Sequence, residues 1–371
     1  MRILLLGEYS NVHATLAQGL RALGHDVLLI SNGDFWKNYP RDIDLSRREG
    51  KWGGVCYVWN LLKLLPRMRG FDVVQLINPM FLEVKAHLIA PVYKYLRRHN
   101  KRVYLCAFGM DYYWVNTCCK HMPLKYSDFN FGNELRQNRD ALQMRKEWLG
   151  TDKEKLNKMI AGDCDGIVAG LYEYYVCYER FFHNKTVYIP FPIVVKPEPE
   201  HTETVIGRPL RLFIGINMSR SEYKGTDIML RAAQDMKARY PEKIKLKVAQ
   251  SVPFNQYQQM LDSSDAILDQ LYSYTPSMNP LEAMSKGIIC IGGGEPDFYR
   301  FIGENELRPI INVEPTYDSV CHEIEQLVLH PERIDALKQQ SRQFIEKHHD
   351  HIKVAHEYIN FWNRNKSFTS Q

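Results

Sequence analysis

Short apolar segments alternate with helix-length amphipathic segments along most of the chain, and this alternation constrains the fold more than any other feature. Residues 2–6 are apolar, Val12, Leu16 and Leu20 follow at helical spacing, and residues 26–30 form the next apolar run. Such alternation is typical of parallel α/β sheets, in which ligands gather at the carboxyl ends of the strands. The first turn lacks G-x-G-x-x-G, so the dinucleotide-binding fingerprint is absent.

A proline-rich stretch divides this pattern into two halves. Five prolines lie within residues 190–209, and a second alternation of apolar runs and helical patterns begins at Leu210. A chain of 371 residues is long enough for two such domains. We therefore predict two doubly wound, Rossmann-like domains facing across a cleft that binds ligand: an N-terminal domain over residues 1–190, a linker over 191–209, a second domain over 210–345, and a C-terminal helix and tail over 346–371 that crosses back to the first domain.

Composition excludes several classes of protein. A net charge of +5 and a pI near 8.6 argue against an extensive nucleic-acid surface. The eight cysteines contain no C-x-x-C pair and lie mostly in apolar segments, which indicates reduced thiols in a cytoplasmic protein. No segment approaches the ~18 uncharged residues of a membrane span.

One basic segment allows two interpretations. A helical pattern over residues 81–98 ends in a group of cations without an acid, namely Lys94, Arg97, Arg98, Lys101 and Arg102. Cations are favoured at helix C-termini, which accounts for the group structurally. The alternative is peripheral contact of residues 94–102 with anionic lipid headgroups on the inner face of the cytoplasmic membrane.

Residues 274–294, YTPSMNPLEAMSKGIICIGGG, contain the strongest site pattern. Turn and cap residues precede Pro280, so we predict a short helix that begins near Asn279 or Pro280 and ends at Gly287. Glu282 lies in its first turn, and the apolar strand 288–291 follows. A helix N-terminus between a turn and a glycine loop suits an anionic ligand with hydroxyl groups.

A second candidate site lies at residues 215–226, GINMSRSEYKGT. Arg220 and Lys224 precede a predicted helix that begins with Gly225 and Thr226. Two cations beside free helix N–H groups make a phosphate site, and the alternative is a solvated surface loop.

Asp111 is the candidate in the N-terminal half. It follows a predicted strand over residues 103–108 and Gly109, where such folds place their chemistry, although a carboxylate there can equally cap a helix. His13, near the start of the first helix, is favoured as a structural residue over a catalytic base. Residues 114–132 are rich in aromatic side chains and irregular, which indicates a loop or lid.

Taken together, these motifs resemble the retaining glycosyltransferases of family 4, which have the two-domain GT-B fold. The resemblance rests on K-G-T at 224–226 and PSMNPLEAMSKG at 276–287. Further similar segments are D-x-I-V-A at 165–169, Ile189–Pro190 before the linker, and a late helix that begins at residues 330–332.

The resemblance implies roles for the candidate residues. Glu282 would hold the ribose hydroxyls of a nucleotide-diphosphate sugar. Arg220 and Lys224, with Gly225 beside them, would hold the diphosphate. The amides of Ser277, Met278 and Asn279 would contact sugar and phosphate, and Asp111, Lys224 and Glu282 form the implied catalytic set.

This sequence departs from the family pattern at several places. Tyr274 stands where the family has the first glutamate of an E-x7-E pair, and Phe108 replaces a common histidine. Arg220 and Lys224 are one residue closer together than is usual. Asp269 and Gln270 replace a common proline and serine, and we expect them to compensate as donor-sugar contacts.

The predicted function is transfer of a sugar from a nucleotide-diphosphate donor to an acceptor hydroxyl, with retention and without a metal or other cofactor. The resemblance suggests a lipid-linked or glycan acceptor in capsular or cell-envelope polysaccharide synthesis. The alternatives are a non-catalytic nucleotide-sugar-binding protein and an epimerase or phosphorylase on the same fold. A nicotinamide-dependent oxidoreductase predicts G-x-G-x-x-G, which neither half contains.

Overall fold

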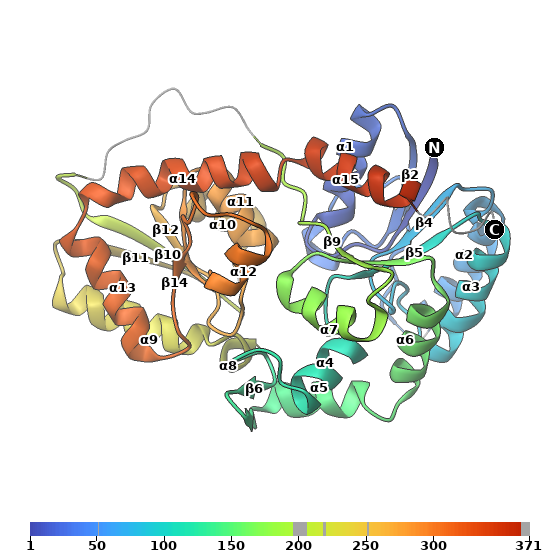
Figure 1. The fold of residues 1–371 in the computed structure, drawn as a ribbon, viewed down its shortest axis with the longest axis horizontal. Coiled ribbons are helices and arrows are strands. Elements are labelled where there is room, and N and C mark those ends of the chain that lie inside the picture. Colours follow the sequence, from blue (N-terminus) through green and yellow to red (C-terminus); the bar gives the residue numbers. More distant parts are fainter. Residues whose placement is uncertain (51, 196–205, 218–219, 251, 365–371) are drawn as a thin grey trace. The chain divides into compact units, whose positions relative to one another are not determined.

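The chain forms two α/β units, shown in the computed structural model of Figure 1, which describes residues 1–371 apart from 51, 196–205, 218–219, 251 and 365–371. Unit 1 comprises Met1–Pro123, Met144–Pro192 and His351–Gln371, and unit 2 comprises Leu124–Gln143 and Ile193–Asp350. The chain therefore leaves and re-enters each unit. Among the described residues, no helix has the length and apolarity needed to span a membrane.

Unit 1 is built on a parallel sheet that, in its described part, has seven strands in the order β3-β2-β1-β4-β5-β8-β9. The strands are β1 (Arg2–Leu6), β2 (Asp26–Ser31), β3 (Ile43–Asp44), β4 (Val73–Leu76), β5 (Val103–Ala107), β8 (Gly166–Ala169) and β9 (Thr186–Tyr188). The order of the strands reverses between β1 and β4. Every residue of β4, β5 and β8 is buried, as expected of a parallel sheet covered by helices on both faces.

The helices around this sheet are α1 (Val12–Ala22), α2 (Gly53–Leu64), α3 (Ala86–His99), α4 (Tyr112–Lys120), α6 (Asp152–Asp163), α7 (Tyr172–Phe182) and α15 (His351–Arg364), with short 3-10 turns η1 (Phe35–Lys37) and η2 (Leu65–Met68). Helix α5 (Arg139–Trp148) contributes residues to both units. The last helix, α15, lies alongside α1 and buries Val354, Ala355, Tyr358 and Trp362 (Figure 1). Unit 1 is therefore completed by the last described helix of the chain.

Unit 2 has a parallel sheet that, among the described residues, has five strands in the order β11-β10-β12-β13-β14. They are β10 (Leu210–Ile216), β11 (Ile244–Gln250), β12 (Ala266–Leu268), β13 (Ile289–Gly292) and β14 (Ile311–Asn312). The helices are α8 (Ser221–Lys224), α9 (Thr226–Arg239), α10 (Phe254–Asp262), α11 (Met278–Ser285), α12 (Pro296–Phe301), α13 (Tyr317–Leu329) and α14 (Glu332–His348). Here the order of the strands reverses between β10 and β12, which are neighbours in the sheet.

An ion-paired carboxylate fixes the edge of this sheet opposite the carboxyl ends. Asp265 precedes β12, is fully buried, and accepts hydrogen bonds from Arg208, Arg211 and Lys338 at 2.7 to 3.3 Å. Burial alone would raise the pKa of Asp265, but these three cations lower it overall. Removing one cation would leave a buried charge under-compensated, so the cluster is structural.

The prediction of doubly wound α/β sheets is confirmed, but one local prediction is wrong. Residues 112–120 form the helix α4 with Trp114 buried, whereas 114–132 was predicted as a loop or lid. The aromatic side chains of α4 fill the interior of unit 1. Residues Leu124–Gln143 cluster with unit 2 although the prediction placed them in a domain over 1–190. Most of the predicted linker, at 196–205, lies outside the described residues.

Candidate functional site

The predicted donor-site residues of unit 2 gather where its strand order reverses, which is where open parallel sheets bind ligands. Helix α11 begins at Met278, one or two residues before the predicted start, with Ser277 as its N-cap. It ends at Ser285, two residues before the predicted end, with Lys286 as its C-cap. Gly287 follows in the left-handed conformation at φ 76°, and the Ile288 N–H donates to the Ala283 carbonyl at 3.1 Å. The first-turn amides therefore belong to a short helix with well-defined ends.

Tyr257, on α10, connects three elements around this point. Its ring packs edge-on against Phe213 of β10 at a centroid distance of 5.1 Å, and its hydroxyl accepts a hydrogen bond from the Asn279 amide at 2.8 Å. Burial raises the pKa of Tyr257, the Asn279 bond opposes this, and the charges of Asp269 and Glu282 raise it further. Groups from β10, the end of β12 and α11 are therefore close together.

Lys224 and Asp269 form the electrostatic pair of the site. Asp269 follows β12, where burial raises its pKa to about 6 and the nearby Lys224 opposes the shift. The Lys224 carbonyl also accepts from the Leu271 N–H at 2.9 Å, so the end of α8 is attached to the loop after β12. Gly225 follows as the N-cap of α9, and Arg220 is exposed just before α8.

Glu282 remains accessible on α11. Its side chain is 42% exposed and its carboxylate lies 3.7 Å from Lys286 Nζ. Lys286 is itself engaged by Asp262 at 2.7 Å and by Gln258 at 2.9 Å. Because Lys286 is shared with other acceptors, Glu282 retains the capacity to accept hydrogen bonds from ligand hydroxyls.

Tyr274 is part of the interior of unit 2. It is buried, and its hydroxyl accepts from the Lys125 N–H at 2.7 Å. Beside it, the buried Glu295 accepts from the Tyr126 hydroxyl at 2.6 Å and from the Asn312 amide at 3.1 Å. Tyr274, which occupies the position of the family's first glutamate, thus binds a segment from the first half of the sequence.

This segment, residues 124–136, borders the site at a second place. Arg136 donates to the carbonyls of Glu222 at 2.7 Å and Tyr223 at 3.0 Å, and its guanidinium lies 3.3 Å from the centroid of the Tyr272 ring. Sequence reasoning missed Lys125, Tyr126, Arg136 and Glu295. Glu295 had a signal, since it follows the glycine triplet at the end of β13.

In unit 1, Asp111 caps α4. One carboxylate oxygen accepts from the Trp114 N–H and the other from the Tyr178 hydroxyl, at 2.9 and 2.7 Å. Burial raises the pKa of Asp111 to about 7, and these hydrogen bonds oppose the shift. The geometry supports the helix-cap interpretation, and a catalytic role stays a prediction.

His13 is also fully enclosed. Its Nδ1 lies 2.8 Å from the Gly7 carbonyl and its Nε2 lies 3.2 Å from Gln75 Nε2. Burial lowers its pKa to about 4, so the ring is neutral at pH 7. These contacts match the structural role favoured from the sequence.

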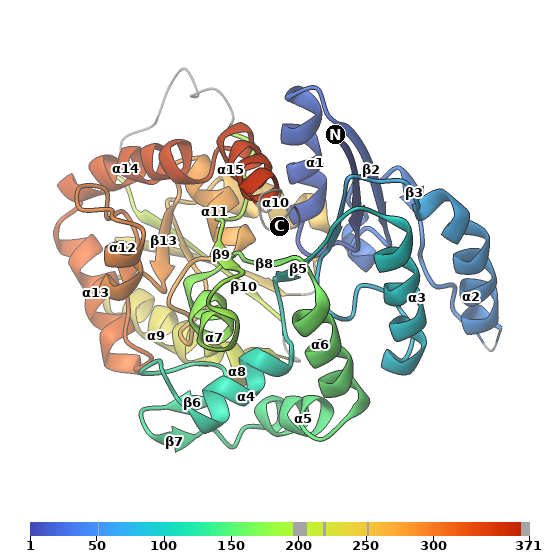
Figure 2. The same cartoon turned by 45° about the vertical axis from the view of Figure 1, so that its right-hand side comes forward.

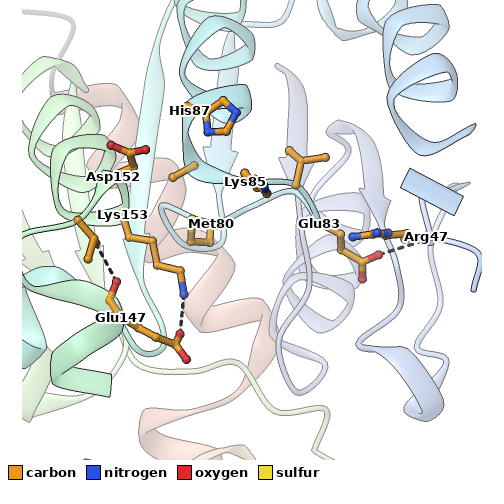
Figure 3. A pocket seen from close by; sticks show the side chains of 11 residues that line it. Arg47, Met80, Glu83, Lys85, His87, Glu147, Asp152 and Lys153 are labelled. Atoms are coloured by element: carbon orange, nitrogen blue, oxygen red, sulfur yellow. Dashed lines mark hydrogen bonds and ion pairs between the residues drawn. The ribbon is translucent and has the colours of Figure 1, made fainter. Parts of the chain in front are cut away.

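Unit 1 also contains a pocket of about 480 Å³ beside the loop that follows β4 (Figure 3). Charged groups line it, and several are paired within it: Lys153 Nζ lies 2.7 Å from Glu147, and Glu83 accepts from the Arg47 N–H at 2.9 Å. Lys85 and His87 are exposed at its rim. Neither this pocket nor any other described part of the chain has a group of three or more His, Cys, Asp or Glu side chains arranged to hold a metal ion.

The region that contains the candidate donor site matches a known family. Residues 215–360 match the family described as "Glycosyl transferase-like". This match begins at the end of β10 and includes Lys224, Asn279 and Glu282. No curated protein sequence is significantly similar to the chain.

Solved structures show the same fold at low sequence identity. HepE from Anabaena, in complex with UDP and glucose, is 10% identical with a TM-score of 0.60, and all of each chain is covered. Sucrose-phosphate synthase from Thermosynechococcus elongatus is 12% identical with a TM-score of 0.59, again over both whole chains. TarM from S. aureus is 10% identical with a TM-score of 0.55, and the match covers 82% of this chain but 58% of TarM.

These similarities define the fold of the protein. The fold is the two-domain GT-B fold of glycosyltransferases, which confirms the predicted fold class. Within it, residues 215–360 form a glycosyl transferase-like region.

Proposed function

We propose that unit 2 binds a nucleotide-diphosphate sugar and that the protein transfers the sugar to an acceptor hydroxyl. The observation that carries the proposal is the convergence of Lys224, Asp269, Asn279 and Glu282 at the strand-order reversal of unit 2. These residues lie in the glycosyl transferase-like region. The similar structure of HepE contains UDP-glucose, which supports a nucleotide sugar as ligand.

The proposed roles follow from charge and accessibility. Lys224 and the exposed Arg220 bind the diphosphate, with the amides near Gly225 and at residues 277–279 as further donors. Glu282 accepts hydrogen bonds from the ribose hydroxyls, because its carboxylate is partly exposed beside that anion site. Asp269 contacts the donor sugar and takes over part of the role of the family's first glutamate, whose position Tyr274 occupies here.

The reaction breaks the bond between the anomeric carbon and the diphosphate oxygen and forms a bond to the acceptor oxygen. Lys224 and the N-terminus of α11 stabilise the negative charge that develops on the leaving diphosphate. We propose retention, in which a diphosphate oxygen takes the acceptor proton on the same face of the sugar. We also propose that no divalent metal is needed, so that activity is unchanged by EDTA.

For the first domain we propose acceptor binding, with Asp111 contributing to turnover. A lipid-linked or glycan acceptor of a cell-envelope or capsular polysaccharide, used in the cytoplasm, fits the family resemblance. Incubation with labelled donor and isolated lipid or glycan acceptors tests this part separately from donor binding.

The central test is a calorimetric screen of UDP-, GDP- and CDP-sugars against the wild-type protein, Lys224→Met and Glu282→Ala. Losing a charge-assisted hydrogen bond removes about 1.5–3 kcal/mol, so each variant should bind its nucleotide roughly tenfold to a hundredfold more weakly. The matched control is Lys237→Met, which removes an exposed lysine on α9. Unchanged affinity in Lys224→Met and Glu282→Ala would remove these residues from the site.

Product analysis separates the alternatives. Donor binding with neither transfer nor hydrolysis would indicate a nucleotide-sugar-binding protein. Conversion of the donor without an acceptor would indicate an epimerase. The anomeric configuration of a transfer product, measured by NMR, distinguishes retention from inversion.

A further inference from the structure

Helix α2 lies at the periphery of unit 1 (Figure 2). It presents an apolar face to solvent. Trp52, Val55, Trp59 and Leu62 are 75%, 61%, 59% and 53% exposed. Their spacing of three and four residues places them on one side of a helix. Large apolar side chains gathered on one exposed helix face are the signature of a binding surface.

The opposite face of α2 is the one that unit 1 uses. Gly53, Tyr57 and Leu61 recur every four residues and are buried. The Tyr57 hydroxyl accepts from the Glu83 N–H at 3.1 Å, which attaches the helix to the loop after β4. The exposed face is therefore not an unsatisfied part of the core, because α2 already has a buried face.

The charged residues in this part of the sequence have one sign. No acidic residue occurs from 50 to 71, whereas Lys63, Arg67 and Arg69 follow the apolar face and are exposed. Lys63 Nζ lies 5.0 Å from the centroid of the Trp59 ring, so cation and aromatic ring are adjacent. An occupant of this surface must have an apolar layer bordered by negative charge.

The basic end of α3 is less available for such a role. Arg97 is paired with Asp165 at 2.5 Å, Lys101 with Asp72 at 2.6 Å, and Arg102 donates to the Trp362 carbonyl. Lys94 and Arg98 remain exposed there. The cations of residues 94–102 thus serve largely to hold unit 1 together, whereas those after α2 flank an exposed apolar face.

We propose that α2 docks on an anionic lipid surface. Trp52 and Trp59 enter the boundary between headgroups and acyl chains, with Val55 and Leu62 beside them. Lys63, Arg67 and Arg69 lie at the level of the lipid phosphates. Trp suits this depth because it combines a large apolar ring with one N–H donor, and flanking cations add attraction to anionic lipids.

The test is sedimentation of the whole protein with vesicles, without donor or acceptor, so that its outcome is independent of the proposed sugar transfer. Vesicles of phosphatidylcholine with about 30% phosphatidylglycerol are compared with phosphatidylcholine alone. We expect binding to the anionic vesicles that weakens as salt rises. Trp52→Ser/Trp59→Ser should lower the partition coefficient at least about tenfold, and Lys63→Gln/Arg67→Gln/Arg69→Gln should abolish the preference for anionic lipid.

Two control variants test whether vesicle binding is specific to the exposed face of α2 and its flanking cations. Leu142→Ser/Leu329→Ser removes two comparably exposed apolar side chains from other helices, and Lys94→Gln/Arg98→Gln removes the exposed cations of α3. Both should bind vesicles as the wild type does. Because all these side chains are exposed, unchanged thermal unfolding verifies that each variant is folded.

Three results would overturn the proposal. The first is absence of wild-type binding to anionic vesicles, and the second is full binding by Trp52→Ser/Trp59→Ser. The third is a wild-type dimer in analytical ultracentrifugation that becomes monomeric in that variant while lipid binding is absent, since a second copy of the chain would then cover α2.

Discussion

Asp111 is a carboxyl group whose protonation is coupled to the stability of unit 1. Its pKa is about 7 in the folded protein against an ordinary 3.8, chiefly because of burial. Between these two pH values the native state holds a proton that the unfolded chain releases. Stability therefore falls as pH rises from about 4 to 7, and the loss is on the order of a few kcal/mol.

Asp111→Asn should flatten this dependence, because the amide cannot ionise yet keeps an oxygen for the Trp114 N–H. Urea unfolding at pH 4.5 and pH 7.5 measures the difference. Turnover under saturating donor tests the second role: a catalytic Asp111 predicts a lower kcat with unchanged donor affinity. A variant with unchanged kcat would show that Asp111 is a helix cap alone, and a pH dependence equal to that of the wild type would contradict the pKa argument.

Gly293 is constrained by close approach of the backbone. A Cβ atom at this position would lie 2.1 Å from the Ser273 carbonyl oxygen. Gly293→Ala must therefore displace the loop before α11, and we expect a destabilisation of roughly 1–3 kcal/mol together with weaker nucleotide binding. The matched control is Gly162→Ala in α6, where a Cβ has open space and a helical backbone, so stability should rise by about 0.5–1 kcal/mol. Equal thermal midpoints for Gly293→Ala and wild type would refute this.

At the scale of elements, the short helix α11 shows what local sequence determines. Pro280, Lys286 and Gly287 act through their own backbone preferences, so both ends of α11 were predicted within two residues. The recurring short apolar segments likewise made the two sheets predictable, because each segment forms a buried strand. These features depend on neighbours in sequence, and periodicity captures them.

Residues 124–136 show what local sequence does not determine. Lys125 bonds to Tyr274 and Arg136 to Tyr223, partners 149 and 87 positions away. The segment contains a two-stranded hairpin, β6 (Asn130–Phe131) and β7 (Glu134–Leu135), too short for a periodic pattern. Its attachment to unit 2, and hence its place beside the candidate donor site, depends on long-range contacts alone.

Arg136 is the residue through which this segment can be tested. Arg136→Ala removes the hydrogen bonds to the Glu222 and Tyr223 carbonyls, those to the Ser127 and Asp128 carbonyls, and the contact with the Tyr272 ring. We expect faster amide hydrogen exchange over residues 124–136 and α8, and nucleotide affinity lower by about fivefold to tenfold because Lys224 ends α8. Arg139→Ala, an exposed arginine three residues on, is the control. Unchanged exchange in Arg136→Ala would mean that the segment is held by Lys125 and Tyr126 instead.

At the scale of the whole molecule, each unit has its own sheet and its own buried core. Unit 1 takes its last helix from the C-terminal part of the chain, so its core is completed by residues far from its first strands in sequence. Unit 2 contains the proposed donor site. Heat or denaturant should therefore act on two cooperative structures, of which one responds to nucleotide.

Trp362→Ala tests this division. Trp362 is fully buried in α15, 5.5 Å from the Tyr358 ring and 6.2 Å from the Tyr104 ring between centroids, so truncation should destabilise unit 1 by roughly 3–5 kcal/mol. In calorimetry the variant should lower the midpoint of one transition and leave the other unchanged, and the nucleotide identified in the donor screen should still raise the midpoint of the unchanged one. Trp52→Ala, which truncates an exposed tryptophan of the same unit, should leave both transitions in place. A single transition whose midpoint falls in Trp362→Ala and rises with the nucleotide identified in the donor screen would instead show that the two units unfold together.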